Sequence, residues 1–441
     1  ICESKSDLVD SDLSRDDGRS DPICRPNYWA IWAVMHIIYI HQYFTTPDMS
    51  GGTRSFEMAK RVVAAGHRVS MITSNREAAA HSGWYTTKEA GIEVHWLPVA
   101  YSNQMSYPKR IWAFVRFAIA SARKAASIRG DLIFATSTPL TVAIPALYAS
   151  WRQNIPMVFE VRDMWPAVPI AMGAIRNPLL VWLARLLERT AYRRSSHIVA
   201  LAPGMKEDVV ATGIPAEKVT VIPNGCDLDV FGKTMTKEIS PREKHDWLTD
   251  RKLVVFTGTL GKANGVSYMA HVAACVKAID PEIRFVVVGN GADAPNVRST
   301  AKQCGVLDST FFMFPSLPKH EAAQWVRSAD VVVCLFTGPR VIWKDAVQNK
   351  FFDAVAAGKP TASNFEGFQS LVAVEHGIGV ILDSKDHVVA AKQLVETLNN
   401  AQWLAGVGSR SRVLAEGKFG RDHLAQRLLT VLANTMTSDS C

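Results

Sequence analysis

The sequence predicts an α/β protein built from two successive doubly wound domains, each a parallel sheet covered by helices. Three observations predict this class. The chain has 441 residues, more than a single hydrophobic core usually organises. Short β-branched apolar runs alternate with helix-periodic segments along the chain. The same alternation restarts after a polar stretch at residues 233–251, which indicates a second domain of the same form.

Composition narrows the class of protein. A hydrophobic content of 48% with 20% charged residues is typical of a soluble globular enzyme. The net charge of +8 favours anionic partners. The seven cysteines are odd in number and form no CxxC pair, which predicts a reducing cytosol and neither a disulfide framework nor a zinc site. No apolar run reaches the roughly 18 residues of a membrane span, and no secretory signal is expected.

The expected strands follow one another in two series, each strand leading into a loop and a helical segment. The first domain is expected to contain strands at His36–His41, Arg68–Thr73, Glu93–Pro98, Leu132–Ala135, Met157–Glu160 and His197–Leu201. The second is expected to contain strands at Leu253–Thr257, Arg284–Val288, Phe311–Phe314, Val331–Leu335, Pro360–Ser363 and Gly379–Leu382.

These series divide the chain into five segments. Residues 1–34 form a polar N-terminal extension that we expect to be mobile. The remaining segments are a domain at 35–225, a linker at 226–250, a second domain at 251–415 and a C-terminal helix within 416–441 that could pack back on the first domain. Since ligands bind beyond the carboxyl ends of parallel strands, two facing sheets would form a cleft, with Asn224 near its hinge.

Glycines follow the first strand of each domain. Gly51 and Gly52 precede a helix, where exposed N–H groups and the helix dipole can contact phosphate; a simple tight turn is the alternative. The pattern is neither a P-loop nor GxGxxG. In the second domain, Gly258 allows close backbone approach beside Thr259, and Lys262 supplies a cation. Gly289 is more typical of a direction-setting turn, though it would line the same cleft.

Two carboxylates lie eight residues apart, at Asp345 and Asp353. On a helix this spacing puts them near one face, where they can accept hydrogen bonds from a polyhydroxylated ligand. Between them, Asn349 can contact the same ligand and Lys350 can face phosphate. A solvated amphipathic helix before a Gly-Pro loop is the alternative.

Arg162 and Asp163 end a strand of the first domain and precede a Trp-Pro pair. Asp163 is expected to orient Arg162 or a sugar hydroxyl, and Arg162 to balance anionic charge. A structural salt bridge is the alternative interpretation.

Two basic helices rich in aromatic and aliphatic residues are expected near 103–129 and 176–194. They can lie on an anionic membrane surface, where each cation adds about 1 kcal/mol. Packing on the sheet with a solvated basic face is equally compatible with the pattern. Nucleic acid is disfavoured because no recognised binding motif is present. No metal-ligand spacing occurs, so a metal-independent mechanism is expected.

Taken together, these motifs resemble the retaining glycosyltransferases of family 4, and most closely its bacterial branch that builds O-antigen, capsule and colanic-acid polysaccharides, including fucosamine-transferase-like members. The resemblance implies a GT-B fold, in which two Rossmann-like domains face each other across a cleft. The first domain would bind the acceptor and the second the nucleotide sugar. Asp353 would bind the ribose hydroxyls, Asp345 would lie near the donor sugar, and Gly51 with Gly52 would meet the pyrophosphate without a metal.

Three positions depart from the family pattern. Aspartate replaces glutamate at both acidic positions. Thr259 and Asn264 stand where the family has Arg and Lys, so Lys262 or Lys350 must supply the phosphate cation. Arg162 replaces a histidine and cannot act as a general base at neutral pH.

The sequence thus predicts an enzyme that transfers a hexosyl or N-acetyl-aminohexosyl group from a UDP-sugar to a lipid-linked saccharide in surface polysaccharide or lipopolysaccharide synthesis. It is expected to need no other cofactor and to lie in the cytoplasm, peripherally at the inner face of the plasma membrane. Cations and N–H dipoles at the leaving diphosphate would carry the catalysis. The alternatives are a nucleotide-sugar epimerase of the same architecture, a non-catalytic sugar-binding protein and a peripheral membrane scaffold.

Overall fold

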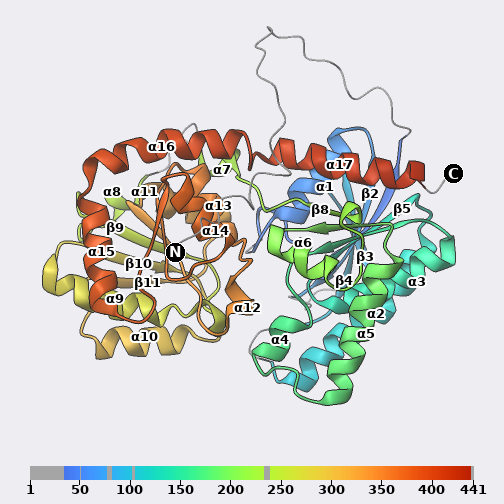
Figure 1. Cartoon of the computed structure of the whole chain (residues 1–441), viewed down its shortest axis with the longest axis horizontal. Helices are drawn as coiled ribbons and strands as arrows, with labels where there is room; N and C mark the ends of the chain where they lie inside the picture. Colours follow the sequence, from blue (N-terminus) through green and yellow to red (C-terminus); the bar gives the residue numbers. More distant parts are fainter. Residues whose placement is uncertain (1–33, 50, 77–81, 102–104, 233–238, 439–441) are drawn as a thin grey trace, which may run out of the picture. The chain divides into compact units, whose positions relative to one another are not determined.

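The computed structural model describes residues 34–49, 51–76, 82–101, 105–232 and 239–438. The expected N-terminal extension lies outside these residues, apart from Val34, and so do residues 233–238 of the expected linker. The described chain forms two α/β lobes, each with its own parallel sheet (Figure 1). The expectation of two successive doubly wound domains is therefore confirmed.

The first lobe holds an eight-stranded sheet in the order β3-β4-β2-β1-β5-β6-β7-β8. Its strands are β1 (His36–Ile40), β2 (Arg68–Asn75), β3 (Tyr85–Glu89), β4 (Ile92–Pro98), β5 (Leu132–Ser137), β6 (Met157–Val161), β7 (His197–Ala200) and β8 (Val219–Val221). Its helices are α1 (Arg54–Ala64), α2 (Tyr107–Ser127), α3 (Ala143–Gln153), α4 (Ala167–Ala171), α5 (Pro178–Arg194) and α6 (Pro203–Val210), with short 3-10 turns η2 (Leu140–Val142) and η3 (Ala216–Lys218).

The second lobe holds a six-stranded, fully parallel sheet in the order β11-β10-β9-β12-β13-β14. Its strands are β9 (Leu253–Thr257), β10 (Arg284–Val288), β11 (Phe311–Phe314), β12 (Val331–Cys334), β13 (Thr361–Ser363) and β14 (Gly379–Ile381). Counted from its own first strand, this order is 3-2-1-4-5-6, the order of dinucleotide-binding sheets.

Helices cover the second sheet and continue to the C-terminus. They are α7 (Leu228–Phe231), α8 (Pro241–Lys244), α9 (Ser267–Ile279), α10 (Ala294–Gln303), α11 (Lys319–Ser328), α12 (Arg340–Trp343), α13 (Asn349–Ala356), α14 (Phe368–Glu375), α15 (His387–Asn399), α16 (Ala401–Glu416) and α17 (Arg421–Ser438), with a 3-10 turn η4 (Lys262–Asn264). The last helix, α17, lies beside α1 (Figure 1) and shares a buried cluster with it through Leu424 and Leu428.

The predicted strands are all present, with ends shifted by at most two residues. Two strands are absent from the predicted series: β8, and β3, which pairs antiparallel with β4 at the edge of the first sheet. Its sequence, YTTKE, contains no apolar run, because an edge strand with a solvated face does not need one. β8, at the junction of the two domains, is only three residues long.

Each sheet changes direction of winding at one place, between β1 and β5 in the first lobe and between β9 and β12 in the second. Beyond the carboxyl ends of the strands at such a point, the loops diverge and leave room for a ligand. The glycines at 51–52 follow β1, and Gly258 follows β9. The fold therefore brings both glycine segments to the ends of the sheets where ligands bind.

A cavity between two glycine loops

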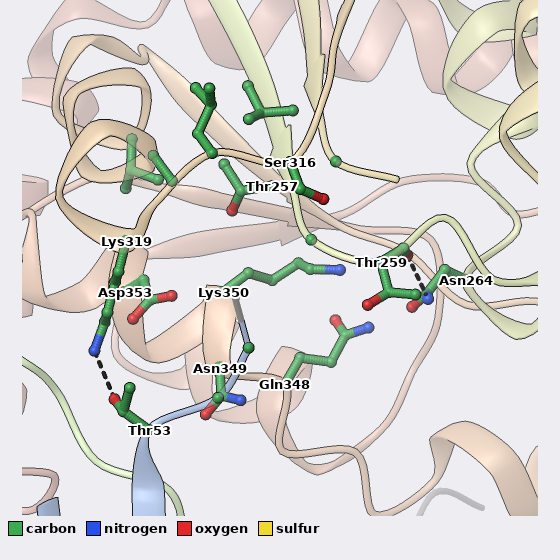
Figure 2. Close-up of a pocket in the computed structure, with 18 of the residues that line it drawn as sticks. Thr53, Thr257, Thr259, Asn264, Ser316, Lys319, Gln348, Asn349, Lys350 and Asp353 are labelled. Carbon is green, nitrogen blue, oxygen red and sulfur yellow. Dashed lines mark hydrogen bonds between the residues drawn. The ribbon is translucent and has the colours of Figure 1, made fainter. Parts of the chain in front are cut away.

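A cavity of about 630 Å³ is lined by residues of both lobes. Figure 2 shows Lys350, Asp353 and Gln348 directed toward it, with Thr257 and Thr259 on the other side. Most of the site residues predicted from the sequence line this cavity, namely Gly51, Gly52, Asp163, Gly258, Thr259, Gly289, Asn349, Lys350 and Asp353.

The loop of the first lobe approaches the second lobe closely at Gly52. A Cβ atom at Gly52 would lie 2.6 Å from Nδ2 of Asn349, so a side chain there would have to displace the Asn349 amide. Gly51 has a φ of +142°, which disfavours any residue with a side chain. The Thr45 hydroxyl donates a hydrogen bond to the Gly52 carbonyl at 2.9 Å and so fixes the position of the loop.

Arg54, the first residue of α1, anchors this loop from inside the first lobe. It is 3% exposed, and its Nη2 lies 2.8 Å from both Glu160 at the end of β6 and the carbonyl of Ile222 before the hinge. A fully paired buried cation of this kind is costly to break. The sequence analysis did not single out Arg54, although a charged residue beginning a helix on an apolar sheet is a usable signal.

Two glycines of the second lobe touch each other behind the cavity. A Cβ atom at Gly289 would lie 1.9 Å from the carbonyl oxygen of Gly258, so the packing of these two loops requires glycine. Asn264 donates from Nδ2 to the carbonyl of Thr259 at 2.8 Å and braces the same loop. Lys262 is exposed and does not line the cavity. Of the two lysines considered for the phosphate cation, the structure brings only Lys350 to the cavity.

Lys350 is a buried cation with no counter-ion. It is 8% exposed and makes no hydrogen bond or ion pair with any residue that the structure describes. Its Nζ lies 3.8 Å from the centroid of the Phe256 ring, a cation–π contact. Burial lowers the pKa of Lys350 to about 8. An ammonium group that is buried without a counter-ion is stabilised when an anion enters the cavity.

Asp353 projects from the same helix, one turn after Lys350. No described residue donates a hydrogen bond to its carboxylate or forms an ion pair with it. Burial raises the pKa of Asp353 to about 6, although the positive charges of Lys319 and Arg421 act in the opposite direction. The carboxylate is thus free to accept hydrogen bonds from a ligand.

The expectation that Asp345 and Asp353 share one helix face is wrong. Helix α13 begins at Asn349, and Asp345 lies in the turn after α12. Residues 346–348 are not helical because their backbone groups bond elsewhere. The Val347 carbonyl accepts from Asn224 Nδ2 at 2.6 Å, and the Gln348 N–H donates to Gln369 at 2.7 Å.

Asp345 instead lines a smaller cavity of about 200 Å³, here called the side chamber, together with Arg162 and Asn224. Asp163 lines both cavities, which also share Phe336, Gln348 and Asn349. The side chamber therefore adjoins the main cavity.

As the structure describes it, the Arg162–Asp163 pair forms neither the expected orienting contact nor a salt bridge; a role of Asp163 toward a sugar hydroxyl and of Arg162 toward anionic charge stays a prediction. These two side chains form no ion pair in the described part of the chain. Arg162 Nη1 lies 3.3 Å from Nε2 of His41, whose pKa is held well below its usual value by burial and by Arg162. Asp163 accepts from the Thr138 hydroxyl at 3.3 Å, and burial raises its pKa. His41, which the sequence analysis did not consider, is therefore the residue that orients Arg162.

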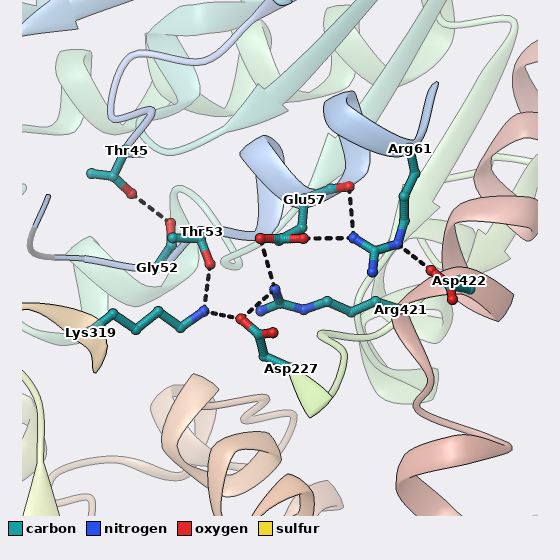
Figure 3. A network of polar contacts seen from close by, with 9 residues as sticks. All are labelled: Thr45, Gly52, Thr53, Glu57, Arg61, Asp227, Lys319, Arg421 and Asp422. Carbon is teal, nitrogen blue, oxygen red and sulfur yellow. Dashed lines mark hydrogen bonds and ion pairs between the residues drawn. The ribbon is translucent and has the colours of Figure 1, made fainter. Parts of the chain in front are cut away.

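A polar network joins the glycine loop to the second lobe and to α17 (Figure 3). Lys319, the first residue of α11, donates from Nζ to the Thr53 hydroxyl at 2.8 Å and to Asp227 at 2.5 Å. Arg421 bonds the same Asp227 oxygen at 2.8 Å and lies 3.3 Å from Glu57. Lys319 and Arg421 also line the cavity.

Lys319 has a weak signal in the sequence, and Arg421 has none. Lys319 follows the loop after β11, a place where strand ends present ligand-binding groups. Arg421 reaches the cavity only because α17 returns to the first lobe. Among the described residues, no group of three or more His, Cys, Asp or Glu side chains is arranged to hold a metal ion; metal independence stays a prediction.

Lys319→Met is expected to raise the KM for a donor substrate about tenfold with a smaller change in kcat. The substitution removes the bond to Thr53 that fixes the glycine loop, while Asp227 keeps Arg421. Steady-state kinetics measure the split between KM and kcat. Arg61→Met serves as control, because Arg61 pairs with Glu57 and Asp422 outside the cavity. Equal effects of the two variants would show that Lys319 only stabilises the fold.

Comparison with known proteins agrees with this geometry. A family model described as a glycosyl transferase 4-like domain matches residues 51–225, and one described as glycosyl transferases group 1 matches residues 251–400. The D-inositol 3-phosphate glycosyltransferase of Xylanimonas cellulosilytica is 26% identical over 306 residues, which are 65% of this chain and 68% of that protein. The alpha-maltose-1-phosphate synthase of Mycolicibacterium smegmatis is 26% identical over 302 residues, 64% of this chain and 74% of that protein.

Solved structures show the same fold. Sucrose-phosphate synthase from Thermosynechococcus elongatus superimposes with a TM-score of 0.73 at 13% identity, over 92% of this chain and all of that one. The Anabaena protein HepE, solved with UDP and glucose, superimposes with a TM-score of 0.67 at 17% identity, over 91% and 100% of the two chains. Since the two family models together cover well over half of the sequence, the chain belongs to the family 4 glycosyltransferases of the GT-B fold.

Proposed function

We propose that this glycosyltransferase moves a hexosyl or N-acetyl-aminohexosyl group from a UDP-sugar to a lipid-linked saccharide in the synthesis of a bacterial surface polysaccharide such as lipopolysaccharide. One observation carries the proposal: the cavity contains an unpaired lysine and an unpaired aspartate, opposite a glycine loop at a helix N-terminus. Phosphate and ribose hydroxyls are the partners that such groups lack.

The donor is proposed to lie along α13. Lys350 and the amides of Gly51 and Gly52 would face the diphosphate, and Asp353 would accept hydrogen bonds from the ribose hydroxyls. A uridine nucleotide is supported by the structural neighbour that was solved with UDP. The names of the two relatives point to phosphorylated acceptors, so the lipid-linked acceptor rests on the basic surface described below and not on them.

The proposed reaction retains the configuration at the anomeric carbon. The acceptor oxygen forms a bond to the anomeric carbon while the bond between that carbon and the diphosphate oxygen breaks. The diphosphate leaves with the bonding electrons and takes up the proton of the acceptor hydroxyl. Lys350 and the glycine amides stabilise the charge that develops on the leaving group, and closure of the lobes excludes water.

The assay uses radiolabelled UDP-sugars with and without a butanol extract of bacterial lipid-linked saccharides. Label that moves into the butanol phase only when both substrates are present supports the proposal. Conversion of the donor alone into its epimer would favour the epimerase instead. Binding of free sugar without binding of UDP would favour a non-catalytic protein.

The donor kcat/KM is expected to show a bell-shaped dependence on pH, falling below about pH 6 and above about pH 8. Binding requires Asp353 as a carboxylate, with a pKa of about 6, and Lys350 as an ammonium, with a pKa of about 8. The free enzyme's pKa values govern kcat/KM. A profile that is flat between pH 5 and 9, recorded as initial rates at low donor concentration, would exclude both groups from the donor site.

Helices α2 and α5 expose the apolar and basic side chains that a membrane-surface site requires. Ile111 and Trp112 on α2 are 49% and 67% exposed, and Leu179, Trp182 and Leu183 on α5 are 62%, 58% and 45% exposed. Arginines lie on the same helices, with Arg116, Arg185 and Arg189 exposed. Within the described ranges, no helix has both the length and the apolarity to cross a bilayer. The two faces support peripheral binding to an anionic membrane at its cytoplasmic side.

Trp182→Glu combined with Leu183→Glu is expected to abolish most binding to vesicles that contain phosphatidylglycerol. Each substitution puts a carboxylate on an exposed apolar position of α5, where anionic headgroups repel it. Cosedimentation with vesicles of phosphatidylcholine, with and without phosphatidylglycerol, measures the effect. Val413→Glu is the matched control, because Val413 is 73% exposed on α16 of the second lobe. If the wild type itself fails to sediment with anionic vesicles, the membrane assignment is contradicted.

A further inference from the structure

The side chamber adjoins the main cavity, within reach of a glycosyl group joined to a diphosphate at the proposed donor site. The two cavities share the wall formed by Asp163, Phe336, Gln348 and Asn349. At about 200 Å³, the side chamber is below the 300–1,000 Å³ of pockets that hold drug-sized ligands, so it suits a single sugar ring and not a whole nucleotide sugar.

Two buried oxygen atoms of the chamber accept no hydrogen bond from the residues that the structure describes. Asn224 is 5% exposed and its Oδ1 has no partner in the described structure, because only its Nδ2 is used, by Val347. Asp345 is 9% exposed, and its Oδ2 accepts no hydrogen bond of good geometry but forms an ion pair with the Lys344 ammonium at 3.4 Å. Buried acceptors without a partner are rare in folded proteins, so the Asn224 oxygen points to a ligand that brings a donor.

Arg162 supplies the complementary group. Its guanidinium bonds His41, and no other side chain in the described part of the chain takes its remaining N–H groups. A guanidinium has five donors, so Arg162 can hold a carbonyl oxygen while His41 fixes its orientation. The chamber therefore offers two acceptors and one fixed donor.

Apolar residues of both lobes form another part of the chamber wall, beside the polar Asp163, Gln348 and Asn349. Val168 and Met205 belong to the first lobe, and Val341 and Ile342 belong to the second. A sugar hydroxyl that faced these apolar residues would stay unpaired, which is unfavourable. A methyl group would match the apolar part of the chamber wall.

We propose that the side chamber receives an acetamido sugar, so that the donor is a UDP-N-acetylhexosamine. The acetamido group has the three features that the chamber matches: an N–H donor for Asn224 or Asp345, a carbonyl acceptor for Arg162, and a methyl group for the wall of Val168 and Ile342. The other of the two side chains Asn224 and Asp345 accepts a hydrogen bond from a ring hydroxyl. This inference rests on the proposed function and narrows its donor from the wider set of hexosyl and N-acetyl-aminohexosyl groups.

The test compares kcat/KM for UDP-N-acetylglucosamine and UDP-N-acetylgalactosamine with that for UDP-glucose, UDP-galactose and UDP-glucosamine. The better of the N-acetylated donors is expected to be favoured at least tenfold over its unacetylated counterparts, because buried polar groups discriminate strongly against ligands that leave them unpaired. UDP-glucosamine keeps the nitrogen and lacks the carbonyl and methyl groups, so it tests the acetyl part alone.

Substitutions of two wall residues test whether the preference for N-acetylated donors arises in the side chamber. Ile342→Thr and Val168→Thr replace an apolar wall residue in each lobe with a polar one of similar or smaller size, and both positions are half-buried, so the fold is retained. Each is expected to lower the N-acetyl preference several-fold while the Kd for UDP itself stays within twofold of the wild type. Thermal melting of each variant verifies folding.

The outcomes separate the two proposals. If UDP does not bind the wild type, the proposed function fails. If UDP binds and the donors are used without an N-acetyl preference, or if the wall variants leave that preference unchanged, the side chamber is not the acetamido site. Preference for a 6-deoxyhexose donor without an acetamido group would likewise overturn the assignment.

Discussion

Replacing Lys350 by methionine is expected to lower the donor kcat/KM at least 100-fold. Lys350 is the buried cation that the cavity holds without a counter-ion, and removal of one preorganised charge at a leaving group costs a factor of about 100–1,000 in kcat. Methionine keeps a similar length and can remain against Phe256, so the loss would report the charge and not the packing. Initial rates with a saturating acceptor measure it.

The same substitution is expected to stabilise the unliganded protein. The folded-state pKa of Lys350 is lowered from 10.5 to about 8, so the folded state disfavours its charged form. The resulting cost is fully present below about pH 8 and disappears as the pH rises above 10.5, where the lysine is neutral in both states. Thermal melting of Lys350→Met should therefore show a gain at pH 7 that shrinks at alkaline pH.

Lys262→Met identifies which lysine supplies the phosphate cation. Lys262 is exposed and lies outside both cavities, so its loss should change the donor kcat/KM far less than the loss of Lys350. The opposite result, with Lys262→Met inactive and Lys350→Met unaffected, would contradict the placement of the diphosphate beside α13.

Asp353→Asn is expected to weaken UDP binding about 10- to 100-fold and to raise the melting temperature. The amide keeps the shape of the side chain but accepts weaker hydrogen bonds from the ribose hydroxyls than a carboxylate does. Isothermal titration with UDP measures the loss of affinity. This variant therefore separates ligand binding from stability, because the two change in opposite directions.

The sign of the stability change follows from the pKa of Asp353. Burial raises it from 3.8 to about 6, so the contribution of this carboxyl to stability is fully present below about pH 4 and lost as the pH rises through 6. A pKa rise of this size corresponds to a loss of at most about 3 kcal/mol in the free energy of unfolding. At pH 7 asparagine removes the free-energy cost of burying the charged carboxylate, so the melting temperature should rise. At pH 4 the carboxyl is neutral in the folded state, so this gain in stability should disappear. Asp229→Asn, at an exposed position, is the control for the loss of one negative charge.

The fold could be predicted because its signals are local. Each core strand carries an apolar run, such as FVVV at Phe285–Val288 in β10, where all five residues Arg284–Val288 are buried. The antiparallel edge strand β3 could not be predicted in this way, because Tyr85–Glu89 has one solvated face. The start of α13 was also missed, since it depends on Asn224 and Gln369, residues distant in sequence that bond the preceding backbone.

The candidate site could be predicted where it follows from strand ends. Gly51, Gly258 and Lys350 were found because glycines and cations beside parallel strands have a direct chemical meaning. Lys319 and Arg421 were not predicted, because their importance comes from contacts with Asp227. Asp227 lies 92 residues from Lys319 and 194 residues from Arg421 in the sequence. Pairings over such separations depend on how the two lobes and α17 come together.

The most direct test of the central claim is a crystal structure of the protein with UDP bound. We expect the diphosphate to lie within hydrogen-bonding distance of Lys350 Nζ and of the Gly51–Gly52 backbone, with the ribose hydroxyls at Asp353. A complex in which UDP occupies another part of the molecule, with Lys350 and Asp353 untouched, would contradict it.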